Sequence, residues 1–372
     1  MMKNLKILHF GVHNSVNGNL GDTVHFFLLR RWFEQFFYPT KLTWKLKQIW
    51  GRNSLADINE INKKIDLVLI GGGGLFLSDQ KNADTSKSGW QLNMSTKLMA
   101  KIEKPIVVFG VGYNRFRNQK DFNKKFKPSI NTLYNKSIFF GLRNTGSIRK
   151  TSNYLGRKKK LILQPCITTI MNKLKYIKNK SNRNTIKKKI AIGFAADRIN
   201  YRFKNKKVLR EFISTIEELI LIWKKKNYKV EIILHKNLDI LLTKKLDNKI
   251  LNDIKVVNLT DASIEKTIDY YKSLDLLFAM RGHHQLIAAG LCTPFYSIIS
   301  HDKIKFFVKD NNLSQYSADV NDTNFKKKLL NFSRSGDNVF KIKKKLGNML
   351  KNNLKITLKN SRNIKKTLFK SL

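Results

Sequence analysis

The chain has 372 residues, of which 42% are hydrophobic and 11% aromatic, so it can bury two domain cores and does not resemble a disordered chain. Its 73 lysines and arginines outnumber 26 acidic residues, giving a formal charge of +47. The excess is scattered along a chain rich in Lys, Asn and Ile, as A/T-rich codons alone would produce, so we do not predict a nucleic-acid partner. The charge remains compatible with anionic substrates or an anionic membrane surface.

The N-terminal residues carry only a brief apolar run before His13, too short for the core of a signal peptide, and no stretch approaches the length of a membrane span. Cys166 and Cys292 lie far apart in apolar surroundings, which predicts buried, inert thiols in a reducing compartment. No clustered set of metal ligands is visible. We therefore expect a cytoplasmic protein that holds no metal and no cofactor.

Strand-like apolar runs recur in the first half of the chain, each followed by a glycine-rich or polar loop. They are LKILHFG (5–11), IDLVLIGG (65–72), PIVVFGVG (105–112), SIFFGLR (137–143) and LILQP (161–165). Such near-continuous runs are typical of strands buried on both faces. A helical pattern, TVHFFLLRRWFEQFF, follows Asp22.

The second half repeats this alternation after a basic linker, MNKLKYIKNKSNRNTIKKK. Its strand-like runs are KIAIGFAAD (189–197), KVEIILH (229–235), IKVVNLT (254–260), LDLLFAMRG (274–282) and PFYSII (294–299), and its clearest amphipathic helix is 210–226. Strands alternating with helices indicate parallel sheets in an α/β architecture. We predict two Rossmann-like domains, 1–179 and 180–372, which face each other across a cleft at the carboxyl ends of the strands.

The loop after the first strand reads NGNLGD and ends at Asp22, directly before an apolar helix. The plainest role for Asp22 is therefore the helix N-cap. Asn19 and Gly21 lie at the same edge of the sheet and could form part of a pocket wall.

Gly71–Gly74 follow the strand-like run 67–70 and match neither the P-loop nor the dinucleotide-binding fingerprint. Four adjacent glycines let a backbone come very close to something else. That partner could be a ligand in the cleft, or only a helix packed tightly on the strand.

Two further loops carry cations at strand ends. Arg143 ends a strand and could bind a carboxylate or phosphate, or only form a surface ion pair, and Ser147 follows where a helix could start. The segment from Leu274 onward is the most informative part of the chain. Its strand leads into Arg281, Gly282, His283 and His284, the helix QLIAAGL and a second strand, and then His301 and Lys303. At most one of the two adjacent histidines should face the cleft, and His235, at another strand end, is a weaker candidate.

Together these segments resemble the polysaccharide pyruvyl transferase family. The resemblance rests on NGNLGD, DLVLIGGGGLF, SGWQLNMS with KPIVVFGVGYNRFR, GLRNTGSIRK, and MRGHHQLIAAGLCTPFYSIISHDK, and it spans residues 10–310. It implies the two-domain fold of GT-B glycosyltransferases. It also implies transfer of the pyruvyl unit of phosphoenolpyruvate onto a sugar of a cell-surface glycan or its precursor, with closure of a ketal.

The resemblance also assigns roles to individual residues. It implies that Arg143, Arg281 and Lys303 bind the donor, with Lys305 as an alternative to Lys303, and that His283 and Arg281 are catalytic. Gly282 stands where the family usually has leucine, and Asn144 where it usually has an acid. Gly71–Gly74, together with Gly21 and Asp22, would line the cleft.

Two other readings of the chain remain open. A GT-B glycosyltransferase that uses a nucleotide sugar would share the fold, although no clear nucleotide-sugar signature is visible near residues 275–300. A non-enzymatic basic protein that binds surfaces would rely on the lysine-rich tail.

That tail is amphipathic. From Val339 to Leu358, apolar residues recur in steps of three or four, which predicts a final helix that docks on the domains. In GT-B-like proteins such a helix often crosses back to the first domain. Its other face is crowded with lysines, so we also expect peripheral contact with an anionic membrane that carries lipid-linked acceptors.

Overall fold

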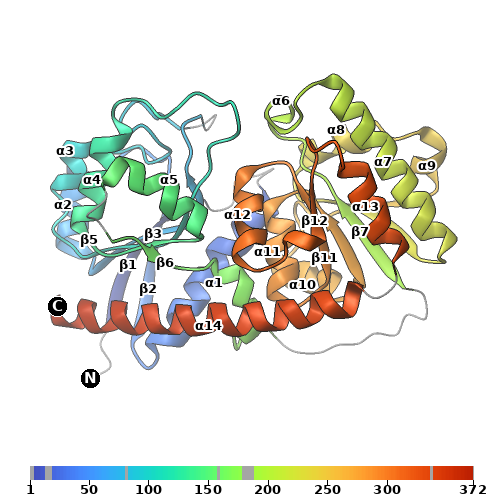
Figure 1. Ribbon diagram of the computed structural model, residues 1–372. Coiled ribbons are helices and arrows are strands. Elements are labelled where there is room, and N and C mark those ends of the chain that lie inside the picture. Colours follow the sequence, from blue (N-terminus) through green and yellow to red (C-terminus); the bar gives the residue numbers. More distant parts are fainter. Residues whose placement is uncertain are drawn as a thin grey trace.

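The structure is a computed structural model, and it describes residues 4–12, 19–79, 83–156, 160–177, 188–335 and 338–371. Two α/β lobes lie side by side, and one long helix runs beneath both of them (Figure 1). The expected architecture of two Rossmann-like sheets is therefore confirmed. The predicted boundary at 179/180 and most of the linker lie outside the described residues.

The first lobe is built on a six-stranded parallel sheet with strand order β2-β1-β3-β4-β5-β6. Its strands are β1 (Asn4–Gly11), β2 (Lys41–Gln48), β3 (Leu67–Phe76), β4 (Ile106–Tyr113), β5 (Ser137–Leu142) and β6 (Ile162–Leu163). Its helices are α1 (Leu20–Phe37), α2 (Leu55–Lys64), α3 (Thr96–Ala100), α4 (Phe126–Lys136), α5 (Thr145–Leu155) and the 3-10 segment η1 (Ile167–Lys173).

The second lobe has its own six-stranded parallel sheet, in the order β12-β11-β10-β7-β8-β9. Its strands are β7 (Lys189–Gly193), β8 (Lys229–Leu234), β9 (Lys255–Asn258), β10 (Leu276–Ala279), β11 (Phe295–Ile299) and β12 (Ser317–Asp319). The helical segments are α6 (Ile199–Arg202), α7 (Lys206–Lys225), η2 (Asn237–Asp239), α8 (Ile240–Thr243), α9 (Asn248–Asn252), α10 (Ile264–Lys272), α11 (Gly282–Gly290), α12 (Asp302–Asp310), η3 (Ser314–Tyr316) and α13 (Phe325–Arg334).

The long helix α14 (Asn338–Ser371) confirms the predicted terminal helix and its crossing to the first lobe. Its first half packs through apolar residues such as Ile342, Leu346 and Met349. Its second half buries a polar stripe that the apolar periodicity could not show. In that stripe, Asn353 donates to Thr169 Oγ1 at 3.0 Å and Ser361 accepts from Trp32 Nε1 at 2.9 Å.

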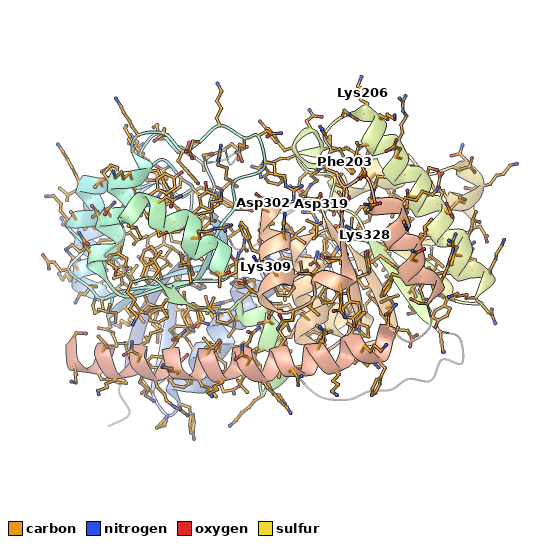
Figure 2. All side chains as sticks on the ribbon, in the orientation of Figure 1. Phe203, Lys206, Asp302, Lys309, Asp319 and Lys328 are labelled. Carbon is orange, nitrogen blue, oxygen red and sulfur yellow. The ribbon has the colours of Figure 1, made fainter. Side chains whose placement is uncertain are left out.

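Apolar packing joins the two lobes as well. One buried cluster runs from the first sheet through α1 and η1 into the second sheet. Polar contacts add to it, because Arg117 of the first lobe pairs with Asp302 at 2.8 Å and Asp319 at 2.7 Å. Figure 2 shows these two carboxylates near each other, on the part of the second lobe that faces the first. The lobes are thus held in a closed arrangement around the space between them.

Candidate active site

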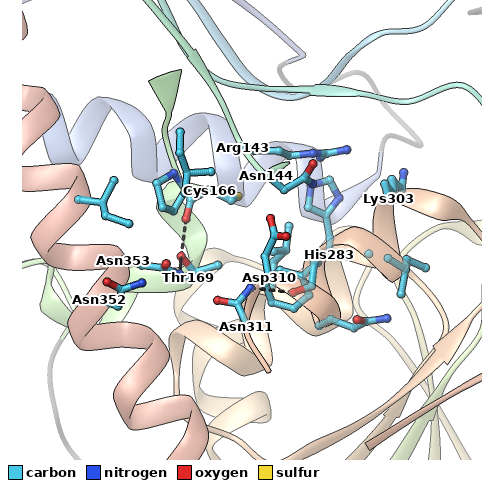
Figure 3. A pocket seen from close by; sticks show the side chains of 18 residues that line it. Arg143, Asn144, Cys166, Thr169, His283, Lys303, Asp310, Asn311, Asn352 and Asn353 are labelled. Atoms are coloured by element: carbon cyan, nitrogen blue, oxygen red, sulfur yellow. Dashed lines mark hydrogen bonds between the residues drawn. The ribbon is translucent and has the colours of Figure 1, made fainter. Parts of the chain in front are cut away.

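A pocket of about 740 Å³ lies between the two lobes and is bounded by α14 (Figure 3). Its wall combines cations and imidazole at one end with amides and apolar side chains toward α14. The lining residues are Arg143, Asn144, Leu163, Pro165, Cys166, Thr169, Gly282, His283, Gln285, Leu286, Lys303, Ile304, Phe307, Asp310, Asn311, Asn352, Asn353 and Ile356. The structure therefore brings Arg143, His283 and Lys303, which are far apart in sequence, into one cavity.

Arg143 follows the last residue of β5 and lies across the neighbouring strand β4. A Cβ atom at Gly112 would come within 2.0 Å of Arg143 Nε, so only a glycine leaves room for the side chain there. The buried Nη2 of Arg143 has no hydrogen-bond partner, and burial lowers the pKa of the guanidinium. No ion pair joins Arg143 to a carboxylate of the described residues, so its charge is available to a ligand.

Lys303 lies in the first turn of α12, and its ammonium group points into the site. Its Nζ donates to Asn114 Oδ1 at 2.9 Å, and Asn114 Nδ2 donates to the carbonyl of Gly74 at 3.1 Å. Burial, reinforced by Arg143, lowers the pKa of Lys303 to about 7. Lys305 is exposed on the same helix, so the geometry favours Lys303 over Lys305.

His283 lies in the first turn of α11, because that helix begins at Gly282 rather than at Gln285 as the sequence pattern indicated. Its Nδ1 is 3.6 Å from Asp22 Oδ1, and its buried Nε2 has no hydrogen-bond partner. Burial and then the neighbouring charges lower the pKa of His283 well below its usual value, so the ring is neutral near pH 7.

The N-terminus of α1 packs directly against His283. A Cβ atom at Gly21 would come within 2.1 Å of His283 Cβ, which explains why glycine is present there. The N-cap of α1 is Asn19, whose Oδ1 accepts from Gly21 N at 3.2 Å. The prediction that Asp22 caps the helix is therefore wrong, because α1 starts at Leu20 and places Asp22 inside its first turn. Asn19 Nδ2 donates to Asp22 Oδ2 at 3.0 Å and so fixes the carboxylate that faces His283.

Arg281 is held by acidic residues of its own lobe. Its Nη2 contacts both Asp197, at 2.7 Å, and Asp239, and its Nε donates to Asp239 Oδ2 at 3.1 Å. Burial alone would lower the pKa of Arg281, but the two carboxylates outweigh it and raise the pKa. The geometry supports a role in positioning the loop before α11, and direct donor binding by Arg281 stays a prediction.

The other two histidine candidates lie inside the second lobe. His284 is fully buried and packs edge-on against His235, with ring centroids 4.0 Å apart. His235 Nε2 is 2.8 Å from the hydroxyl of Tyr271. The expectation that only one of the adjacent histidines faces the cleft is thus confirmed by the geometry, and that histidine is His283.

Ser147 is a structural residue in this geometry. Its backbone N–H donates to Asn144 Oδ1 at 2.7 Å, and its hydroxyl accepts from Tyr113 N at 3.1 Å. Asn144, where the family resemblance leads one to expect an acid, therefore caps α5.

Gly71–Gly74 lie within β3, which runs to Phe76, and not in a loop after the strand as the sequence predicted. They allow close approach of protein groups. A Cβ at Gly72 would come within 1.7 Å of His25 Nε2, and one at Gly74 within 2.6 Å of Asn114 Nδ2. A Cβ at Gly73 would meet nothing within 4 Å, although its φ of +97° favours glycine.

The family of the chain follows from comparison with known proteins. The model of the polysaccharide pyruvyl transferase family matches residues 19–302, which include Arg143 and His283 of the pocket and end one residue before Lys303. The chain belongs to the polysaccharide pyruvyl transferase family. No curated protein matches it in sequence.

Solved structures resemble this family member in fold. UDP-GlcNAc 2-epimerase from Neisseria meningitidis, bound to UDP-GlcNAc, is 12% identical with a TM-score of 0.54, and the match covers 99% of this chain and 100% of that one. MnaA of S. aureus, from a co-structure with UDP, is 11% identical with a TM-score of 0.54, covering 92% and 91% of the two chains. UDP-GlcNAc 2-epimerase from Methanocaldococcus jannaschii is 12% identical with a TM-score of 0.52, covering 90% and 93%. These likenesses support the expected GT-B-like fold.

The contact between Cys166, which lines the pocket of this pyruvyl transferase family member, and His25 was not predicted from the sequence. Cys166 is buried as expected, but its sulfur lies 3.1 Å from His25 Nδ1. Burial would raise the pKa of the thiol, yet His25 and Thr168 outweigh it and bring the pKa to about 7. That the thiol is inert stays a prediction. Cys292 is only half-buried. His25 was hidden in the apolar pattern of α1, and only the fold brings it to Cys166.

Within the described ranges, no three His, Cys, Asp or Glu side chains gather in a way that could hold a metal ion. In the same ranges, no helix is both long enough and apolar enough to span a bilayer.

Proposed function

We propose that this protein transfers the pyruvyl group of phosphoenolpyruvate to a sugar of a cell-surface polysaccharide or its precursor. The observation that carries the proposal is the set of Arg143, Lys303 and His283 in one pocket. Two partly buried cations lack a carboxylate partner among the described residues, and they share the pocket with an imidazole nitrogen that lacks a hydrogen bond. A small ligand with a phosphate and a carboxylate would supply the missing partners.

The donor would lie between Arg143 and Lys303. Phosphoenolpyruvate carries up to three negative charges, which would favour the protonated form of Lys303 and offset the cost of burying the Arg143 guanidinium. Arg143 offers paired N–H donors with the geometry of a carboxylate or phosphate, whereas Lys303 acts as a point charge. The bonds of Lys303 to Asn114 and of Asn114 to Gly74 would hold the ammonium in place before the donor arrives.

His283 would move the proton that the reaction requires. In the first step, a sugar hydroxyl adds to C2 of the donor, and C3 gains a proton. The neutral Nε2 of His283 can take the hydroxyl proton and return one to C3, while Asp22 beside Nδ1 stabilises the imidazolium formed in between. A second hydroxyl then attacks C2 as the bond from C2 to the phosphate oxygen breaks, its proton leaves with the phosphate, and the product is the pyruvate ketal.

Incubation with phosphoenolpyruvate and a panel of glycans tests this function. We expect release of inorganic phosphate together with a matching mass gain of the sugar. A parallel incubation with UDP-sugars controls for a nucleotide-sugar transferase. Sugar transfer from a UDP-sugar, without any reaction of phosphoenolpyruvate, would overturn the proposal.

We also propose that the protein works in the cytoplasm with a glycan or lipid-linked acceptor, and needs no cofactor beyond phosphoenolpyruvate. Because the exposed face of α14 is rich in lysine, peripheral contact with an anionic membrane belongs to the same proposal.

A further inference from the structure

The pocket has two chemically different ends, and the proposed function accounts for only one of them. Arg143, Lys303 and His283 make up the cationic end. The other end reaches α14, and Figure 3 shows Asn352 and Asn353 projecting toward it from that helix. We propose that this second end, the α14 end, is the binding site of a neutral sugar and positions the acceptor; this rests on the proposed function.

At the α14 end, the side-chain amide nitrogens of Asn353 and Asn311 are hydrogen-bonded to the protein, which leaves the amide oxygens for a ligand. Thr169 Oγ1 donates to the carbonyl of Cys166 at 2.7 Å, so it must accept the bond from Asn353 Nδ2 at 3.0 Å. That requirement fixes the orientation of the Asn353 amide. Asn311 is fixed similarly, because its Nδ2 donates to the carbonyl of Phe307 at 2.8 Å.

In both cases the amide oxygen forms no hydrogen bond with the described part of the chain, and both residues line the pocket. An oriented carbonyl oxygen is a suitable acceptor for a sugar hydroxyl. Asn352, exposed on α14, adds an amide that can both donate and accept.

Apolar side chains alternate with these amides. Leu286, Phe307 and Ile356 lie in the same wall and offer surface to the C–H faces of a pyranose ring. Sites with a mostly apolar wall and a few fixed polar groups are typical for small neutral ligands.

The charges of the wall argue against an anionic ligand at the α14 end. Beyond the cationic end, the one charged residue that lines this pocket in the described chain is Asp310. Its carboxylate accepts from both the backbone N–H and the hydroxyl of Thr145. A phosphate placed beside it would meet a like charge, so any phosphate carrier of the acceptor must lie outside this end of the pocket.

The α14 residues also lie outside the segment 19–302 that the family model matches. Acceptor recognition would therefore depend on a part of the chain that this match does not include, while Arg143 and His283 of the cationic end lie within the match and Lys303 directly follows it.

The first test is the variant Ile356→Trp, which fills the α14 end, compared with Lys355→Trp on the exposed face of the same turn. With a glycan that is pyruvylated, we expect Ile356→Trp to raise the acceptor KM by about tenfold or more while donor affinity stays unchanged. Lys355→Trp should match the wild type, and melting curves check that both variants fold. An unchanged acceptor KM in a folded Ile356→Trp protein would overturn the inference and leave the proposed function intact.

The second test needs no turnover. Cys166 lines the pocket with a thiol pKa of about 7, so iodoacetamide should label it at pH 7.5, while Cys292 lies outside the pocket and serves as an internal reference. We expect methyl β-D-galactopyranoside or methyl β-D-glucopyranoside to slow labelling of Cys166, and to have little effect in Ile356→Trp. If a glycoside protects Cys166 from labelling but no pyruvyl transfer occurs, the sugar site is supported and the proposed donor is wrong. Absence of protection by both glycosides would overturn the sugar site.

Discussion

Two groups of charged side chains meet near the start of α11, and they differ in how they are paired. In the second lobe, Arg281 and Arg202 share Asp197, and Arg281 also binds the fully buried Asp239. Between the lobes, Arg143 and Lys303 form no ion pair with a described carboxylate.

The pKa values show the same contrast. Carboxylates raise the pKa of Arg281 despite its burial, whereas burial lowers the pKa of Arg143 and Lys303. Arg202 does not follow this contrast, because burial lowers its pKa although Asp197 is its partner. A paired buried charge holds a loop in place, while an unpaired one costs free energy until a ligand completes it. Ion pairing therefore distinguishes Arg281, which shapes the site, from Arg143 and Lys303, which are left to bind an anionic substrate.

The largest expected effect is on catalysis. His283→Ala should lower kcat by about 10²–10⁴-fold with nearly unchanged donor affinity, because the proton carrier is lost but both cations remain. Steady-state kinetics and calorimetric titration of phosphoenolpyruvate measure the two quantities. His284→Ala is the control. Loss of turnover in His284→Ala but not in His283→Ala would show that His283 is not the proton carrier.

Breaking the paired group should mainly affect folding. Asp239→Asn should lower the free energy of unfolding by about 3–5 kcal/mol, because it leaves the buried Arg281 guanidinium undercompensated. Asp302→Asn is a suitable control, because its half-exposed ion pair with Arg117 should contribute about 1 kcal/mol or less. Denaturant unfolding of both variants gives the comparison. Equal losses for the two would contradict the special role of the buried pair.

Removing an unpaired cation should have the opposite pattern. Arg143→Met should weaken phosphoenolpyruvate binding by about 2–5 kcal/mol and leave the free energy of unfolding unchanged or higher, since a buried, unpaired charge disappears. Arg149→Met, on the exposed face of α5, should change neither quantity. A destabilised Arg143→Met protein with normal donor affinity would show that Arg143 is structural.

Lys303 should make donor binding depend on pH. Its pKa is lowered to about 7 in the free protein, so it is charged below pH 7 and must take up a proton to bind the donor above it. The affinity advantage of the wild type over Lys303→Met should therefore be largest below pH 7 and shrink by up to about tenfold per pH unit above it. Titrations between pH 6 and 8.5 measure the ratio. A ratio near one at every pH would remove Lys303 from the donor site, and a large ratio that does not vary with pH would contradict only its lowered pKa.

The smallest expected effect concerns the membrane. Each lysine of α14 near an anionic surface should contribute about 1 kcal/mol, and the attraction should fade with salt. Co-sedimentation should therefore favour phosphatidylglycerol liposomes over phosphatidylcholine liposomes at low salt only. Equal binding to both, or none to either, would leave α14 with its docking role alone.

Much of the fold could be predicted because the central strands are continuous apolar runs, as in β4 and β10. The edge strands β2 and β12 escaped, since β2 is partly exposed and alternates with lysine and β12 has only three residues. Within the site, Arg143, His283 and Lys303 were found from their positions after strands. His25 and Asp239 were not, because one lies in an apolar helix and the other acts only through a partner distant in sequence.

The crossing of α14 has a consequence for how the protein is made. The carbonyl of Leu163 and the side-chain oxygen of Gln164 accept from Asn360, and the Trp32 indole donates to Ser361, so these groups of the first lobe are bonded by α14. On the ribosome, the 197 positions that separate Leu163 from Asn360 include the whole second lobe, which emerges before those partners. The surface of the first lobe that α14 covers therefore stays exposed until the end of synthesis. We expect a chaperone that binds nascent chains to bind there.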